Sequence, residues 1–178
     1  MRALLTIRAA IDRLNAFVGT AVSWLVLLMV GVGAFNALAR YVGPSLGLNL
    51  ASNAWLELQW YLFSLVFLLG AADVLRRDAH VRVDVLYGRL SERGKTWINL
   101  AGTVVFLIPF CVFGLVVSLP SVEASWAVWE QSPDAGGLPR WPLKTCILVG
   151  FGLLLLQGIS ELIGQIDALR PGPEEDAA

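Results

Sequence analysis

Two long stretches of the sequence, Leu14–Ala39 and Thr96–Val122, contain no charged residue. A helix needs about 20 mostly apolar residues to cross the hydrocarbon core of a bilayer, and each stretch is long enough. The whole chain is 57% hydrophobic and only 15% charged, whereas soluble domains are about 25% charged. The core of a soluble domain of this size is too small to bury so many apolar side chains, so we expect the bilayer to be the solvent.

Two shorter uncharged runs complete a set of four. Leu58–Ala72 is bracketed by Glu57 and Asp73, and Thr145–Ser160 by Lys144 and Glu161. Each run reaches spanning length only if the bracketing charges lie near the interfaces or face protein. The sequence therefore predicts an all-α integral membrane protein that forms a single membrane domain, residues 1–178. The expected spans are about 14–39, 54–75, 92–119 and 142–166, with a solvated tail at 170–178.

The basic residues indicate an orientation. With four spans and a cytoplasmic N-terminus, ten Lys and Arg residues fall inside and three outside, which favours cytoplasmic N- and C-termini in a bacterial inner membrane. The outside three are Arg40, Arg140 and Lys144. The first span follows a basic segment and could be mistaken for a secretory signal, but it exceeds the 7–15 apolar residues of one. We therefore expect an uncleaved first helix.

The connection at 79–90 is polar and basic. Polar and apolar residues alternate from His80 to Val85, which alone suggests a strand, but a lone strand beside a bilayer leaves its backbone edges unpaired. The same residues fit a short amphipathic helix lying in the inner interface, which we prefer. Ser91 is a candidate N-cap for the third span, as Ser52 or Asn53 is for the second. Pro109 lies inside the third span, where we expect a packing kink.

Catalytic and cofactor motifs are missing. The one histidine, His80, excludes bis-histidine haem ligation, and Cys111 and Cys146 lie in separate apolar runs without a C-x-x-C pair. No phosphate-binding loop or nucleophile elbow is present, and no internal repeat of the kind that builds self-sufficient transporters. We expect no enzyme activity, no cofactor, no metal and no nucleic-acid partner.

Three groups of residues are candidates for interactions. Polar residues in or near the spans are costly in lipid and need partners, either inside the bundle or on a second membrane subunit; they are Asn36, Glu57, Gln59, Asp73, Gln157 and Glu161. Residues around the inner connection suit lipid headgroups, with His80 and Asp84 able to pair on one helical face; they are Arg76, Arg77, His80, Arg82, Asp84 and Arg89. The outer loop offers an interfacial belt or a docking surface; its candidates are Trp126, Trp129, Glu130, Asp134, Arg140 and Lys144.

The segment Asp78-Ala-His-Val-Arg-Val-Asp-Val-Leu resembles an H-x-R-x-D element of a known family. The family is that of the small permease (DctQ-type, Q) subunits of tripartite ATP-independent periplasmic (TRAP) transporters, in which this element follows the second of four helices. The stretches Glu57–Phe63, Trp129–Ser132 and Leu156–Glu161 are similar to the family as well. The resemblance covers about Leu14 to Ile166.

The resemblance implies a partner and a role. Members pair with a large permease that carries substrate and sodium, and a periplasmic binding protein captures the substrate. In some relatives the two permeases are fused, whereas here we expect the large permease to be a separate chain. The chain is then a non-catalytic scaffold for the symport of organic acids, of the dicarboxylate or 2-oxo acid class. The alternative is a membrane anchor or assembly subunit of an unrelated inner-membrane complex, which also predicts four helices and no cofactor.

Overall fold

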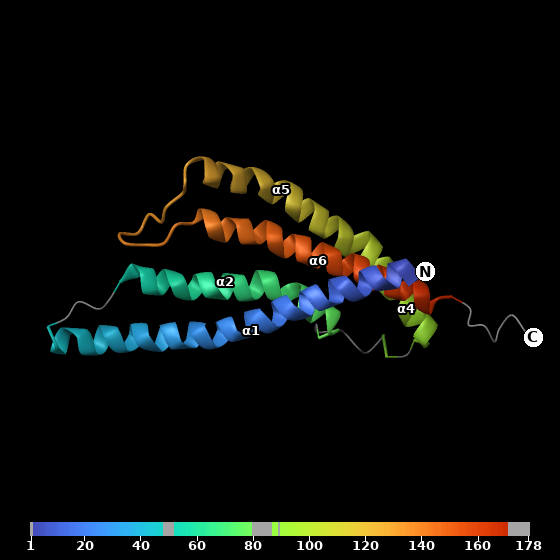
Figure 1. Ribbon diagram of the computed structural model, residues 1–178, viewed down its shortest axis with the longest axis horizontal. Coiled ribbons are helices and arrows are strands. Elements are labelled where there is room, and N and C mark those ends of the chain that lie inside the picture. Colours follow the sequence, from blue (N-terminus) through green and yellow to red (C-terminus); the bar gives the residue numbers. More distant parts are fainter. Residues whose placement is uncertain (1, 48–51, 80–86, 89, 171–178) are drawn as a thin grey trace, which may run out of the picture.

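Four long helices make up the protein in a computed structural model that describes residues 2–47, 52–79, 87–88 and 90–170 (Figure 1). They are α1 (Arg2–Ser45), α2 (Asn53–Arg76), a composite third helix and α6 (Trp141–Ala168). The third helix consists of α4 (Glu92–Gly102), the π-helical turn η1 (Thr103–Leu107) and α5 (Ile108–Ala127). All four are long and apolar enough to cross a membrane, which confirms the all-α membrane fold.

The expected interfacial helix at 79–90 lies largely outside the described residues, because 80–86 and 89 are not among them. Its existence stays a prediction. The two expected N-caps are formed: Ser52 accepts a hydrogen bond from the Ala54 amide at 3.2 Å, and Ser91 accepts one from the Gly94 amide at 3.2 Å. These caps satisfy backbone N–H groups that the first turn of a helix leaves without partners.

Helix α6 is the centre of the bundle, since it packs against α1, α2 and α5, while α1 also packs along α2. In Figure 1, α2 and the second half of α1 run side by side below α6, α5 lies on the other side of α6, and the start of α1 and the end of α6 lie at the same end of the molecule. We call this the terminal end, and the opposite end, which carries the loop between α5 and α6, the loop end. The two ends therefore hold different sets of candidate residues.

Helix α1 is longer than a bilayer requires. Its 44 residues span about 66 Å at ~1.5 Å per residue, against about 30 Å of hydrocarbon. It must tilt or extend past the hydrocarbon, and it begins at Arg2, well before the apolar stretch. Hydropathy detects only the part of a helix that crosses the hydrocarbon.

The expected irregularity near Pro109 takes the form of the π-helical turn Thr103–Leu107, in which the Ile108 amide donates to the Thr103 carbonyl. Pro109 is the second residue of α5, two positions after the end of this turn. Proline has no N–H and its ring crowds the preceding turn, so a local change of helical register is the expected response.

The distribution of polarity is the reverse of that in a soluble protein. Large apolar side chains point outward, among them Phe17 at 73% and Trp24 at 66% exposed on α1 and Phe106 at 73% exposed in η1. Gln157 and Ser160 are fully buried and Asn15 is 1% exposed. Apolar side chains are stable in contact with lipid, whereas polar side chains exposed to lipid are costly. The polar side chains are therefore buried inside the bundle.

Candidate functional site

A buried polar network joins α1 to α6 near the terminal end. The Asn15 Nδ2 donates to Gln157 Oε1 at 2.7 Å, and Gln157 Nε2 donates to Asp12 Oδ1 at 3.1 Å and to Glu161 Oε1 at 3.3 Å. The Ser160 hydroxyl also donates to Asp12 Oδ1, at 2.6 Å. One turn of α6 is thus tied to one turn of α1. Gln157 and Glu161 were expected from the sequence, whereas Asp12, Asn15 and Ser160 were not.

A second buried carboxylate, Asp73, lies at the end of α2, where it is 8% exposed. It accepts from Arg76 Nε at 2.9 Å and pairs with Arg77 Nε at 2.8 Å. Gly19 of α1 makes room for it, because a Cβ added there would lie 2.4 Å from the Asp73 carboxyl carbon. Asp73 therefore holds two of the arginines expected at the lipid headgroups.

The other four residues that the sequence places at the lipid headgroups lie outside the described part of the chain. His80, Arg82, Asp84 and Arg89 are all among the residues that the structure does not describe. The pairing of His80 with Asp84 thus stays a prediction.

At the loop end, Glu57 of α2 binds the loop between α5 and α6. Its carboxylate is 2% exposed and accepts the Ser132 hydroxyl and the Leu138 backbone amide. Gly137 fits against it, since an added Cβ would lie 2.7 Å from Glu57 Oε2. Position 137 is a glycine because the Glu57 carboxylate and the Ser132 side chain leave no space for a Cβ atom.

The same stripe of α2 holds the loop at two further points. Asn53, four residues before Glu57, donates to the Ala135 carbonyl at 3.1 Å. Tyr61, four residues after it, donates to the Pro139 carbonyl at 2.8 Å. Residues four apart share one face of a helix, so α2 fixes the loop along two turns.

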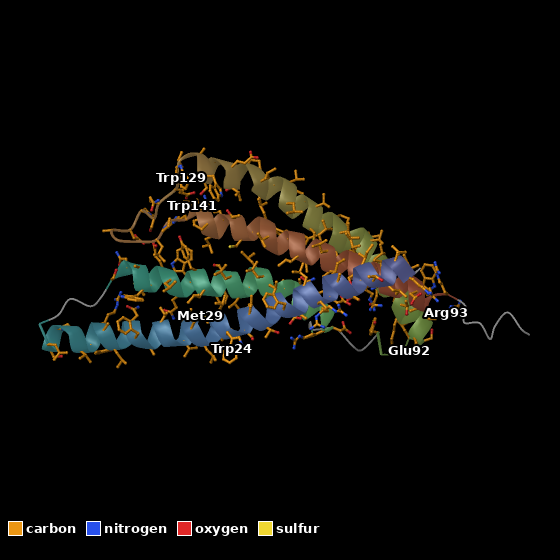
Figure 2. The ribbon with its side chains drawn as sticks, viewed as in Figure 1. Trp24, Met29, Glu92, Arg93, Trp129 and Trp141 are labelled. Carbon is orange, nitrogen blue, oxygen red and sulfur yellow. The ribbon has the colours of Figure 1, made fainter. Side chains whose placement is uncertain are left out.

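Three tryptophans gather beside this loop, where α5 ends and α6 begins, and Figure 2 labels two of them, Trp129 and Trp141. The ring centroids of Trp126 and Trp141 are 4.2 Å apart, those of Trp129 and Trp141 are 5.2 Å apart, and Trp126 Nε1 donates to Thr145 Oγ1 at 2.8 Å. Trp129 is 59% exposed and has a positive φ of 47°, which the fixed loop maintains. We call Trp126, Trp129 and Trp141 the tryptophan cluster.

Next to the cluster, Lys144 bonds to Glu130 across the base of the loop. The hydrogen bond from Lys144 holds the pKa of Glu130 below its usual range, so this carboxyl is ionised at neutral pH. Arg140 lies close by, with its amide donating to the Glu130 carbonyl at 2.8 Å, and Asp134 is exposed on the loop. The structure therefore brings the six expected loop residues to one end of the bundle.

Asn36 and Gln59 are the remaining expected polar residues. Asn36 is 5% exposed, and its Oδ1 has no hydrogen-bond partner among the described residues. Gln59 packs against Gly33 of α1 and lines a small groove of about 300 Å³ together with Met29 and Trp60. Unlike Glu57 or Gln157, Gln59 borders a surface that opens outward.

Within the described ranges, no three His, Cys, Asp or Glu side chains gather closely enough to hold a metal ion. What the structure offers is two fixed polar regions, one at each end of an apolar bundle. Such an arrangement holds helices together and presents surfaces at both ends of the bundle.

Comparison with known proteins assigns a family to this bundle. Residues 29–168 match the family model of the DctQ component of tripartite ATP-independent periplasmic transporters. No curated protein and no solved structure matches the chain. The match covers most of the chain. It includes Glu57, the loop that Glu57 binds and the α6 residues of the buried polar network, and it agrees with four membrane-spanning helices. The chain belongs to the DctQ family, the small membrane subunits of TRAP transporters.

Proposed function

We propose that this chain is a non-catalytic scaffold that pairs with the large permease of a sodium-coupled transporter for organic acids, of the dicarboxylate or 2-oxo acid class. The observation that carries the proposal is that buried polar side chains of α1 and α6 bond these two helices to each other. A bundle fixed in this way is suited to be the static part against which a transport domain moves. Substrate and sodium would then bind in the large permease.

The proposed orientation places the terminal end in the cytoplasm of a bacterium and the loop end in the periplasm. It rests on the positive-inside rule, because the basic side chains concentrate at the terminal end. Those among the described residues are Arg2, Arg8, Arg13, Arg76, Arg77, Arg93, Lys95 and Arg170. The loop end carries Arg40, Arg140 and Lys144. Arg77, whose side chain is 56% exposed, is better placed than Arg76 to meet anionic lipid.

The intramembrane polar residues then divide into two roles at the large-permease interface. Glu57, Asp73 and Gln157 are bonded inside this chain, so they would act by holding the helices that form the contact surface. Gln59 and Glu161 are only partly buried, so they are the candidates for direct contact, although Glu161 also accepts a hydrogen bond from Gln157. Polar groups on a lipid-facing surface are costly, which favours their coverage by a partner.

Co-purification tests the proposed role. A tagged form of this chain, extracted from native membranes in mild detergent, is expected to bring down a much larger polytopic permease in about equal amount, because a scaffold must stay bound through the transport cycle. Mass spectrometry identifies what is recovered. Recovery of this chain alone, or with an unrelated complex, would remove the scaffold proposal and leave the membrane fold.

We also propose that the tryptophan cluster and the charges beside it dock the periplasmic binding protein. Support comes from the loop itself: three α2 side chains hold it in one conformation, so its outer surface is pre-organised for binding. Exposed tryptophan is also the residue type most enriched at the energetic centres of protein interfaces.

Substituting Trp129 with alanine is expected to weaken capture of the binding protein about tenfold, the loss typical of one central aromatic contact. Surface plasmon resonance on the assembled permease complex measures the affinity, and uptake in proteoliposomes should fall in parallel. Trp24→Ala is the matched control, since Trp24 is similarly exposed, at 66%, on the outward face of α1 (Figure 2). If both variants bind like the unmodified complex, the cluster is only an interfacial belt.

A further inference from the structure

Gln59 is a polar side chain at the outer surface of α2. It is partly buried, and its amide makes no side-chain hydrogen bond with any of the described residues. It lies near the start of the uncharged run Leu58–Ala72, which spans about 22 Å at ~1.5 Å per residue, less than the ~30 Å of hydrocarbon. A bilayer centred on this run covers both of its ends, so Gln59 lies within the hydrocarbon.

An amide at this depth needs hydrogen-bond partners that lipid does not supply. The side-chain amide has two N–H donors and a carbonyl oxygen that accepts hydrogen bonds. Acyl chains have neither donors nor acceptors, so an unbonded amide in hydrocarbon is costly. The lack of a bond to Gln59 within the described residues therefore indicates a polar partner from another molecule.

The surface around Gln59 is a shallow groove between α1 and α2, with a volume of about 300 Å³. Gln59 lines it together with Met29 of α1 and Leu56, Trp60 and Phe63 of α2. Gly33 of α1 lets the amide lie against that helix, since a Cβ added there would lie 2.8 Å from Gln59 Nε2. Leu56, Trp60 and Phe63 are exposed, so the groove opens away from the bundle.

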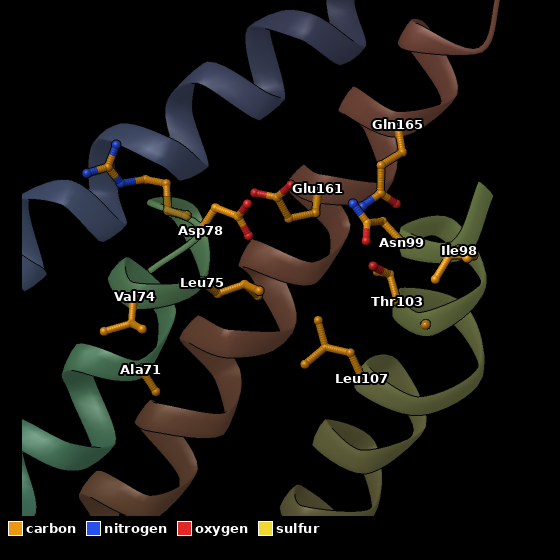
Figure 3. A pocket seen from close by; sticks show the side chains of 12 residues that line it. Ala71, Val74, Leu75, Asp78, Ile98, Asn99, Thr103, Leu107, Glu161 and Gln165 are labelled. Carbon is orange, nitrogen blue, oxygen red and sulfur yellow. The ribbon is translucent and has the colours of Figure 1, made fainter. Parts of the chain in front are cut away.

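Glu161, the other partly buried candidate for contact, is already engaged within the chain. Figure 3 shows it among the residues that line a cavity of about 620 Å³ near the terminal end. It accepts a hydrogen bond from Gln157 Nε2 at 3.3 Å, and the Arg8 guanidinium, which lies against Gly164 of α6, interacts with its charge. Gln59 is therefore the candidate whose partner the described residues do not include.

Three kinds of molecule could cover the groove, and they differ in what they offer Gln59. An acyl chain fills an apolar groove but forms no hydrogen bond. A second copy related by a twofold axis brings the same groove face to face with itself, and two concave surfaces leave unfilled space. A helix of a different subunit presents a ridge of side chains that fits a groove, and it can carry a polar residue opposite the amide.

We propose that the groove at Gln59 receives a transmembrane helix of the large permease, and that a Ser, Thr, Asn or Gln side chain of this helix bonds to the Gln59 amide. The inference rests on the proposed pairing with the large permease and adds the contact surface on this chain. Membership of a tripartite transporter family supplies the kind of partner that the groove requires. The exposed face of α5, which carries Phe113, is then left to lipid.

Photo-cross-linking in native membranes tests the contact. A photoreactive phenylalanine analogue replaces either Phe63, which lines the groove, or Phe113, which is similarly exposed on α5 at the other side of α6. We expect the large permease to be cross-linked in several-fold higher yield from position 63 than from position 113. An equal or lower yield from position 63, or a product that joins two copies of this chain there, would overturn the proposal.

Co-purification of the large permease with the unmodified chain is measured in parallel. Its absence would remove the proposed scaffold function itself, and the groove proposal with it. Normal co-purification without cross-linking from position 63 would leave the scaffold function and place the contact elsewhere on the chain.

Removing the Gln59 amide tests the hydrogen bond. Gln59→Leu is expected to raise the dissociation constant of the complex in detergent about threefold, the size of one hydrogen bond between membrane helices. The unfolding temperature of the isolated chain should stay unchanged, because Gln59 bonds to no described residue. Gln157→Leu is the matched contrast, since it removes an amide that is bonded inside the bundle. Unchanged affinity in Gln59→Leu, or a loss of stability of the isolated chain, would contradict the proposed contact.

Discussion

Replacing Gly150 with valine is expected to destabilise the bundle by about 2–3 kcal/mol, the cost of overpacking a well-packed interface. Gly150 is buried on α6 where α6 crosses α2, and a Cβ added there would lie 2.8 Å from the Leu68 backbone oxygen and 3.1 Å from the Leu68 Cβ. A helix backbone does not yield as a flexible side chain does, so α2 and α6 must separate. Thermal unfolding of the purified protein in detergent measures the loss.

Gly152→Val separates this clash from the general effect of valine in a helix. Gly152 is on the same helix, and a Cβ added there meets nothing within 4 Å. Both substitutions change helix propensity and chain entropy alike, so the difference between them reports packing alone. We expect Gly152→Val to leave the unfolding temperature nearly unchanged. Equal losses in the two variants would show that Gly150 does not set the distance between α2 and α6.

The spans were predictable because a helix that crosses the hydrocarbon requires a continuous run of apolar residues in the sequence. The uncharged runs 14–39 and 96–122 lie inside α1 and the composite third helix. The ends of the helices were harder to predict from hydropathy. Helix α1 starts at Arg2, well before the apolar stretch, because a helix outside the hydrocarbon tolerates charged residues. Ser52 and Ser91 were recognisable as N-caps because capping depends on neighbours within three residues.

The pairings between distant residues were not predictable from a single sequence. Glu57 bonds to Leu138, 81 residues away, and Asn15 bonds to Gln157, 142 residues away. Which helix faces which, and at what height, depends on packing over the whole bundle. A partial indication was present, since Asn15 lies three residues after Asp12, and Ser160 and Glu161 lie three and four residues after Gln157, so each set shares one helical face. Sequence reasoning considered Gln157 and Glu161 and overlooked the facing residues on α1.

Removing the amide of Gln157 is expected to have the second large effect. Gln157 takes part in three side-chain hydrogen bonds, with Asn15, Asp12 and Glu161, and is fully buried. Gln157→Leu keeps the size of the side chain and removes all three. At about 0.6 kcal/mol per hydrogen bond between membrane helices, the loss is about 2 kcal/mol. Unfolding of the purified chain in detergent, followed by circular dichroism, measures it.

Two comparisons show whether the loss arises from the link between α1 and α6. Gln165→Leu removes a side-chain amide of the same size from the same helix. The buried Oε1 of Gln165 has no donor among the described residues, so the stability of this variant should not fall. A double-mutant cycle of Gln157→Leu with Asn15→Leu should give a coupling of about 0.6 kcal/mol, because the second substitution removes a partner that has already lost its bond. Additive losses would mean that the 2.7 Å contact between these amides contributes nothing to stability. A measurable coupling would show that this hydrogen bond helps to hold α1 against α6, as the proposed scaffold role requires.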